Sequence, residues 1–228
     1  ANINVKSYDH AIHANSDVAL ENGENALGAI TVNGGNLTVY SNDDGLHADG
    51  TLTLNSGNVS VSRSYEGAEG TNVAINGGKL SIISSDDGIN ATANSGTAIS
   101  ITGGEVYIYC TGDGIDSNSR SSHEGIVFSG GKTVVISNSN GNSSIDSEKG
   151  YSYTGGSVIA LMPRGGMSGE ATNCKDFSSV GYSGSLSLSS GAYLSASIGE
   201  ADLTLKMPCG MSALVVVPGF SPSRLTVV

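Results

Sequence analysis

The chain has 228 residues, of which 33 are glycine, and its 10 Lys and Arg residues against 21 Asp and Glu residues give a net charge of −11. Nucleic-acid affinity rests mainly on Lys and Arg side chains that neutralise phosphates, so this charge argues against a nucleic-acid partner. The longest apolar run, residues 213–217, is far shorter than the ~20 residues of a membrane-spanning helix, and we expect no membrane span. Gly, Ser, Thr and Asn are abundant where helix formers would otherwise stand, which favours an all-β fold.

The chain opens with a short segment, His10-Ala11-Ile12-His13, that is the first copy of a recurring turn. Later copies have the form acidic-Gly-apolar-polar and begin at Asp44, Glu66, Asp87 and Asp113. A degenerate copy begins at Ser143. These copies indicate an internal repeat.

Glycine-containing tripeptides recur with the same period. They begin at Asn33, Asn55, Asn76, Thr102, Ser129 and Thr154. The spacing is roughly 21 to 27 residues, as in solenoid proteins. Short alternating strands separate the two kinds of turn, and a unit of this length has no room for a helix. Each unit therefore reads as one coil of a parallel β-helix, which must stack on its neighbours to bury its apolar face.

Stacking predicts columns of equivalent side chains, in which successive members of one column are about 4.8 Å apart. We expect two inward columns after the glycine turns: Leu37, Val59, Leu80, Val106 and Val134, then Val39, Val61, Ile82, Ile108 and Ile136. Cys110 takes a place that other coils give to serine, so it is expected to be a small buried residue.

The period is lost after Gly156, and we divide the chain into residues 1–160, the parallel coils with acidic turns, and residues 161–228, a terminal coil with an antiparallel β cap. Alternating segments predict strands at residues 185–189, 202–207, 213–217 and 225–228. Three cysteines permit at most one internal disulfide, and we expect it between Cys174 and Cys209.

The acidic turns are the most informative feature of the sequence. Stacking would bring carboxylates to about 5 Å from one another, where like charges destabilise a sheet, and few Lys or Arg residues lie nearby. Calcium accepts six to eight oxygen ligands, so we predict several Ca²⁺ ions between successive coils. The candidate ligands are Asp43, Asp44, Glu66, Glu69, Asp86, Asp87, Asn90, Asp113 and Asp116. The alternative is a solvated acidic edge in which Asp serves only as a turn former.

Two further surfaces have candidate ligands. His13 aligns with His47 and lies three residues after His10, which makes a transition-metal site a second possibility for this region. Tyr40, Tyr107 and Tyr109 lie on the outward side of the strands, where tyrosine rings and hydroxyl groups suit a sugar polymer. Ordinary surface packing of these tyrosines is the alternative.

The runs at residues 43–54, 64–70 and 85–91 resemble the carbohydrate-binding β-helix family of cellulose- and pectin-degrading anaerobic bacteria. The resemblance spans roughly residues 30–160. It implies a right-handed parallel β-helix similar to pectate-lyase-like polysaccharide lyases, several bound calcium ions at the acidic turns, and a secreted or surface-attached protein that binds cellulosic and pectic polysaccharides.

We therefore expect a non-catalytic, calcium-binding module for plant cell-wall polysaccharide such as polygalacturonate, present as a monomer. One alternative is a calcium-dependent pectate-lyase-type enzyme that acts by β-elimination, in which Arg63 or Arg120 would be the base. The other alternative is a purely structural surface scaffold.

Overall fold

The computed structural model describes residues 1–22, 27–93, 96–118, 125–175, 182–198, 201–219 and 221–228. Nearly all regular structure in these residues is β-strand, and the one helix among them is α1 (Ser168–Ala171). The expected all-β class is confirmed. No helix in the described part of the chain has the length and apolar character to cross a membrane.

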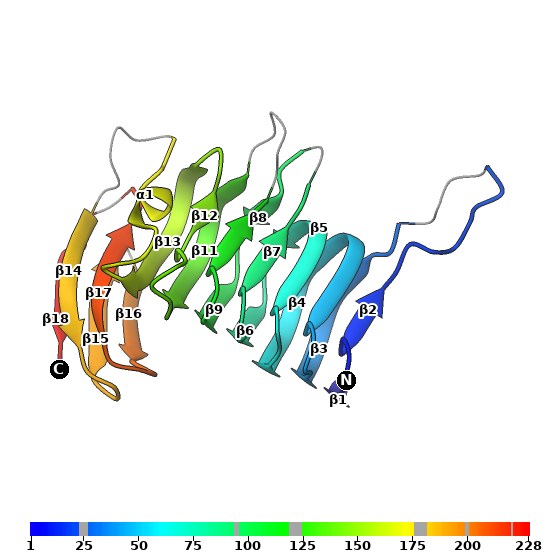
Figure 1. Cartoon of the computed structure of the whole chain (residues 1–228), viewed down its shortest axis with the longest axis horizontal. Helices are drawn as coiled ribbons and strands as arrows, with labels where there is room; N and C mark the ends of the chain where they lie inside the picture. The colour runs from blue at the N-terminus through cyan, green and yellow to red at the C-terminus, as the bar shows by residue number, and fades with distance from the viewer. Residues whose placement is uncertain (23–26, 94–95, 119–124, 176–181, 199–200, 220) are drawn as a thin grey trace.

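Parallel strands from successive repeats lie side by side in a stack that runs along the long axis of the molecule (Figure 1). The stack has three faces, which we number by the order in which the chain enters them. Face 1 contains β1 (Asn2–Lys6), β6 (Lys79–Ile83), β9 (Glu105–Cys110) and the C-terminal parts of β3 (Ile30–Tyr40), β4 (Leu46–Arg63), β11 (Ile126–Ser137) and β13 (Tyr151–Pro163).

Face 2 follows the acidic turns. It contains β2 (Ile12–Ala14), β7 (Ile89–Ala91), β10 (Ile115–Ser117), β12 (Asp146–Ser147) and the N-terminal parts of β4 and β5 (Ala68–Ile75). Face 3 contains β8 (Ile99–Ile101), the middle of β4, the C-terminal part of β5 and the N-terminal parts of β3, β11 and β13. Because β4 and β11 each run through a corner, β4, β6, β9, β11, β8 and β5 are joined into a closed ring of parallel pairings.

The interior of the stack is filled by the alternate side chains of all three faces, as period-2 alternation requires. In face 1 the inward column begins with Leu37, Val59, Leu80 and Val106, as expected. Its next member is Thr133, which pairs with Val106.

The predicted placement of Val134 and Ile136 in these inward columns is wrong by one residue. Val134 pairs with Tyr107 and Ile136 pairs with Tyr109, so both point outward, and Val135 takes the inward place beside Ile108. Residues 134–136 are apolar on both faces because the outward side is also covered, and alternation cannot fix the register of such a strand.

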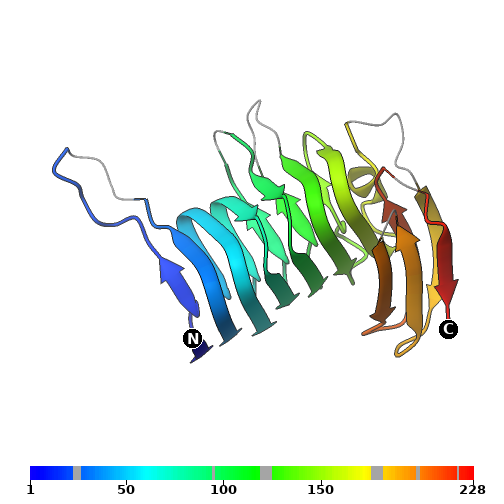
Figure 2. The ribbon, with the colours of Figure 1, turned by 180° about the vertical axis from the view of Figure 1, so that it is seen from behind.

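The outward side is covered by a second, smaller sheet at the C-terminal end (Figure 2). Its three antiparallel strands have the order β16 (Ala201–Lys206), β15 (Tyr193–Ile198) and β18 (Arg224–Val227). Ile136, Ile159 and Leu161 pack against it in a separate core. The C-terminal strands were predicted from alternation except for β15.

Antiparallel strands extend the sheet of face 1 beyond β13, its last parallel strand. Parallel pairing of β13 with β11 runs to Leu161, and residues 160–163 pair antiparallel with β17 (Met211–Val217). β17 pairs in turn with β14 (Tyr182–Leu188). These two strands cover the edge that the stack would otherwise expose at this face.

The expected disulfide between Cys174 and Cys209 is not formed, and all three cysteines are free thiols. Cys174 is buried, and its backbone forms an isolated parallel β-bridge with that of Tyr151. Cys209 is only partly buried and lies in the cap beside Tyr109. Cys110 is fully buried, as expected. The fold therefore rests on stacking and packing rather than on a covalent link.

Candidate functional site

Two columns of side chains run along the edge of face 2, three residues apart in every coil. Backbone hydrogen bonds at the turn place His10, Asp44, Glu66, Asp87, Asp113 and Ser143 in the first column. Strand register places His13, His47, Glu69, Asn90, Asp116 and Asp146 in the second. The predicted alignment is confirmed, including the alignment of His13 with His47.

The first column also holds neighbouring coils together. One carboxylate oxygen of Asp44 accepts a hydrogen bond from the Glu66 N–H at 3.2 Å, and Oδ1 of Asp87 accepts one from the Asp113 N–H at 2.7 Å. Asp113 accepts in the same way from the Ser143 N–H at 2.5 Å. Each of these three carboxylates therefore uses one oxygen to bind the backbone of the next coil, and the other oxygen of Asp44 contacts Nδ1 of His47 and of His10.

Carboxylates of the two columns form two compact clusters. Asp44, Glu66 and Glu69 each place an oxygen within 4.8 Å of the others, and Asp87, Asp113 and Asp116 do the same two coils further along. We call these sets the Asp44 cluster and the Asp87 cluster. Each cluster is a set of hard oxygen donors, the type of ligand that Ca²⁺ and Mg²⁺ prefer.

The clusters are costly for the protein when its carboxylates are ionised without a counter-charge. Burial, together with repulsion from the nearby carboxylate of Glu69, raises the pKa of Glu66 to about 8. Burial raises the pKa of Asp87 to about 7 and that of Asp116 to about 8, with repulsion from neighbouring aspartates as an additional cause. Protons or cations must therefore neutralise these clusters near neutral pH.

The remaining predicted ligands lie around the clusters. Asn90 lies between them and donates from its amide to both carboxylate oxygens of Glu66, at 3.2 Å each. Asp43 lies outside the Asp44 cluster, with an oxygen 3.8 Å from Nδ1 of His10. Asp86 interacts with the hydroxyl of Tyr65, and this hydrogen bond raises the pKa of Tyr65.

The predicted set did not include two polar residues at the far end of the columns. Asp146 pairs with Asp116 in the strand register, and burial raises its pKa to about 6. The amide of Asn118 donates to Oδ2 of Asp116 at 2.6 Å. The period of the repeat could have identified Asp146 as a member of the second column, whereas Asn118 lies outside the repeated positions.

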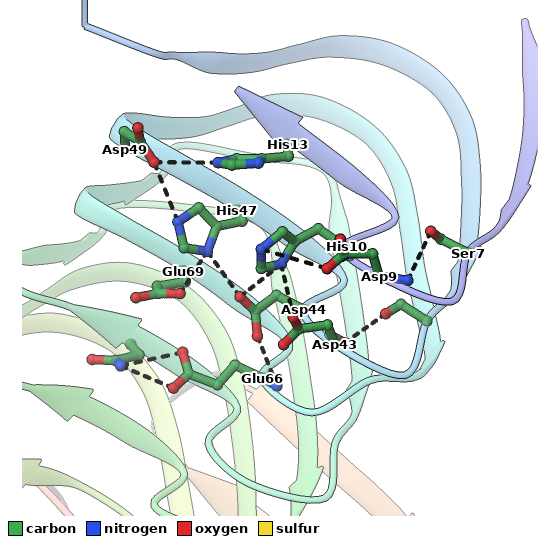
Figure 3. A network of polar contacts seen from close by, with 12 residues as sticks. Ser7, Asp9, His10, His13, Asp43, Asp44, His47, Asp49, Glu66 and Glu69 are labelled. Atoms are coloured by element: carbon green, nitrogen blue, oxygen red, sulfur yellow. Dashed lines mark hydrogen bonds and ion pairs between the residues drawn. The ribbon is translucent and has the colours of Figure 1, made fainter. Parts of the chain in front are cut away.

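A cluster of three imidazoles stands at the start of the two columns (Figure 3). The ring centroids of His10, His13 and His47 are 4.6 to 4.8 Å apart. Nδ1 of His47 contacts Asp44 at 2.8 Å and Glu69 at 2.7 Å. Burial by itself lowers the pKa of His47, but the hydrogen bond to Asp44 and the charge of Glu69 outweigh it, and the pKa is raised.

Asp49 lies opposite this cluster and was not among the predicted ligands. Its Oδ1 is 3.3 Å from Nε2 of His13 and 3.4 Å from Nε2 of His47. Its other oxygen accepts a hydrogen bond from the Ser16 N–H at 2.7 Å. This hydrogen bond and the neighbouring His13 lower the pKa of Asp49, so that its carboxylate is ionised.

The three tyrosines do not form one exposed surface. Tyr107 and Tyr109 are half-buried and pack against the second core under the C-terminal sheet. Tyr40 lies elsewhere on face 1, between the cations of Lys6 and Arg63, and its hydroxyl accepts a hydrogen bond from Arg63 at 2.7 Å.

A groove of about 820 Å³ crosses five consecutive coils at the corner between faces 3 and 1. Its lining is Gly57, Asn58, Gly78, Lys79, Gly104, Glu105, Gly131, Lys132, Gly156, Ser157 and Ala201. The glycines have positive φ, from 74° to 94°, and a Cβ on any of them would meet backbone atoms of the preceding coil at 2.5 to 2.8 Å. Sequence reasoning identified the glycines as turns but not as the floor of a groove.

A second hollow of about 350 Å³ adjoins this groove. It lies between face 1 and β16, shares Lys79, Glu105 and Lys132 with the larger groove, and is lined in addition by Tyr107 and Asp202. The five coils of the larger groove correspond to four stacking steps of about 4.8 Å, or roughly 19 Å of continuous surface. A surface of this length and shape suits an extended polymer.

The structure describes one of the two residues considered as a lyase base. Arg63 is engaged with Tyr40, and no ion pair between Arg63 and a carboxylate is present among the described residues. Arg120 lies outside the described residues.

Together, the stacked parallel strands, the acidic columns and the long groove define an all-β repeat protein with a surface suited to ligand binding. A family model described as "Carbohydrate-binding domain-containing protein" matches residues 1–67 and residues 26–109 of this chain. The match supports a role in carbohydrate binding and is consistent with a non-catalytic module. Comparisons with curated proteins and with solved structures gave no match.

Proposed function

We propose that this chain is a non-catalytic, extracellular module that binds plant cell-wall polysaccharide and contains structural Ca²⁺ ions. The observation that carries the proposal is the family match over residues 1–109, which supports carbohydrate binding. In this proposal the parallel stack is a right-handed β-helix, and the protein acts as a monomer on the cell surface or after secretion.

Calcium is assigned to the Asp44 and Asp87 clusters. Each cluster brings three carboxylate oxygens within 4.8 Å of one another, and each is partly buried. A divalent cation would replace the protons that burial otherwise favours and would join successive coils through residues such as Asp87 and Asp113. The predicted ligands Asp43 and Asp86 lie beside these clusters, and Asn90 lies between them.

The glycan is assigned to the groove over the glycine turns rather than to the three tyrosines as a group. Glycine floors are flat, which allows sugar rings to approach the backbone. The lining of the larger groove carries Lys79 and Lys132 against one carboxylate, that of Glu105. In a chain of net charge −11, this groove is a place where a uronate polymer such as polygalacturonate would meet cations. Tyr107 contributes an aromatic wall in the adjoining hollow.

The test is a pull-down of purified protein on insoluble polygalacturonate and on cellulose, with and without a chelator. We expect retention on at least one polymer, and we expect release when both Lys79 and Lys132 are replaced by alanine. The matched control is Lys206→Ala, which removes an exposed lysine from β16 that does not line the groove. Retention of the double variant equal to that of the control would overturn the assignment of the groove.

The lyase alternative is tested in the same samples. Growth of ultraviolet absorbance from unsaturated uronate products, abolished by the chelator, would make the chain a β-eliminating enzyme. A chain that is retained by no polymer and gives no product would support the third possibility, a structural scaffold.

A further inference from the structure

The histidine cluster at the start of the columns has a donor set different from that of the acidic clusters. His13 comes from β2, in the first coil, whereas His47 and Asp49 come from β4, in the second coil. Nε2 of each histidine faces the same carboxylate oxygen, Oδ1 of Asp49 (Figure 3). A donor atom from each of the three residues lies within 4.8 Å of the other two.

We propose that His13, His47 and Asp49 form a binding site for one transition-metal ion of the Zn²⁺ class, which joins the first two coils of the stack. The distances support a shared ion. Zn²⁺ lies about 2.1 Å from nitrogen and carboxylate ligands, which places tetrahedral ligand atoms about 3.4 Å from one another. The two measured distances from Asp49 Oδ1, 3.3 Å to His13 and 3.4 Å to His47, match this edge.

The surroundings of His47 prepare it as a ligand. Its Nδ1 lies 2.8 Å from Asp44 and 2.7 Å from Glu69, so we assign the ring proton to this nitrogen. In the neutral ring, Nε2 then carries the lone pair and faces Asp49. A carboxylate that fixes the far nitrogen of a metal-binding histidine is a common feature of zinc sites.

Asp49 is fixed in a similar way. The hydrogen bond from the Ser16 N–H engages Oδ2 and leaves Oδ1 directed at the two imidazoles. His10 packs edge-on against His13 and lies against His47, and its Nδ1 faces Asp44 at 3.1 Å. His10 is thus a packing neighbour in this proposal and not a ligand.

Three protein ligands leave one tetrahedral position open. The side chains of His13, His47 and Asp49 are 36%, 21% and 33% exposed, so solvent reaches this position. Imidazole ligands favour Zn²⁺, Ni²⁺ and Cu²⁺ over Ca²⁺, which prefers oxygen ligands. The site is therefore chemically separate from the Asp87 cluster, with which it shares no residue.

The test uses chelator-treated protein titrated with Co²⁺ and with Zn²⁺. We expect one Co²⁺ ion to give the intense visible absorption of tetrahedral coordination, Zn²⁺ to displace it, and Zn²⁺ to raise the melting temperature. His13→Ala and Asp49→Asn are expected to weaken Zn²⁺ binding by more than the ~10–100-fold that loss of a supporting partner costs. Both residues are partly exposed, and unchanged circular dichroism would show that the variants fold.

Two controls separate this site from its neighbours. His10→Ala should retain one Co²⁺ ion with tetrahedral absorption, and Asp87→Asn should leave the Co²⁺ titration unchanged. Absence of stoichiometric Co²⁺ binding would overturn the proposal, since an imidazolium hydrogen-bonded to Asp49 would then account for the contacts. Loss of binding in His10→Ala with retention in His13→Ala would also overturn it. Because the readout needs neither Ca²⁺ nor glycan, it is independent of the proposed function.

Discussion

Oδ1 of Asp87 accepts a hydrogen bond from the backbone N–H of Asp113 in the next coil, at 2.7 Å. The same side chain belongs to a cluster of three carboxylates. One residue therefore supports the stacking of the coils and also adds to the charge repulsion within the stack. How these two effects balance depends on pH and on cations.

The stability of the cation-free protein should fall as pH rises from about 4 to about 8. Burial raises the pKa of Glu66 and of Asp116 to about 8, above the ordinary values of 4.5 and 3.8. The folded state thus binds more protons than the unfolded state in this range, and linkage makes the free energy of unfolding decrease with pH. A loss of about 1 kcal/mol corresponds to about 2–4 °C in melting temperature for a domain of this size.

The measurement is thermal unfolding in a chelator across this pH range, repeated with millimolar Ca²⁺. Calcium should reduce the fall most strongly near pH 8, where protons compete least with the cation for Glu66 and Asp116. A melting temperature that rises steadily from pH 4 to pH 8 in the chelator would contradict this account of the clusters.

The double substitution of Asp87→Asn with Asp116→Asn should stabilise the cation-free protein and weaken its binding of calcium. Asparagine keeps an oxygen for the Asp113 N–H but removes charge, so the cation-free variant should melt higher than the wild type at pH 8. It should also bind at least one Ca²⁺ ion fewer, measured by calorimetric titration. Asp202→Asn is the control, since Asp202 pairs with Arg224 on the exposed side of the small sheet. Equal calcium stoichiometry in variant and control would argue against a site in the Asp87 cluster.

Thr133→Val should stabilise the protein by about 1 kcal/mol. Thr133 is fully buried in the inward column, and its hydroxyl has no hydrogen-bond partner in the described part of the chain. An unsatisfied buried hydroxyl costs about 1–3 kcal/mol, and valine has nearly the same shape. Urea unfolding measures the effect. The reciprocal change, Val134→Thr, should destabilise the contact with the small sheet. If Thr133→Val destabilised the protein and Val134→Thr stabilised it, the result would favour the predicted register, in which Val134 points inward.

Gly78→Ala should destabilise the protein by about 2 kcal/mol or more, since two costs combine. The φ of Gly78 is 77°, and a Cβ would lie 2.5 Å from the carbonyl oxygen of Gly57. Gly191→Ala is the matched control, because Gly191 has a φ of 81° but nothing within 4 Å of a Cβ. Denaturant unfolding of the two variants should differ clearly. Equal losses would mean that close stacking at the glycine turn costs nothing beyond backbone strain.

The all-β class, the period and most of the side-chain columns could be predicted from the amino-acid sequence. Regular turns at fixed spacing and strict alternation leave little freedom, because a slip of one residue would turn every apolar side chain outward. That is why His13, His47 and Glu69 could be aligned before any coordinates were known. The same reasoning failed at Val134 and Ile136, where both faces of the strand are apolar.

Features that depend on contacts across the stack could not be predicted in this way. The small C-terminal sheet covers Ile136, and this long-range contact explains the apolar residues that misled the alternation. The separation of Cys174 from Cys209 likewise depends on how the cap folds back. The approach of Asp49 to two imidazoles and the glycine groove arise because coils stack about 4.8 Å apart, which brings together side chains that lie one repeat apart in sequence.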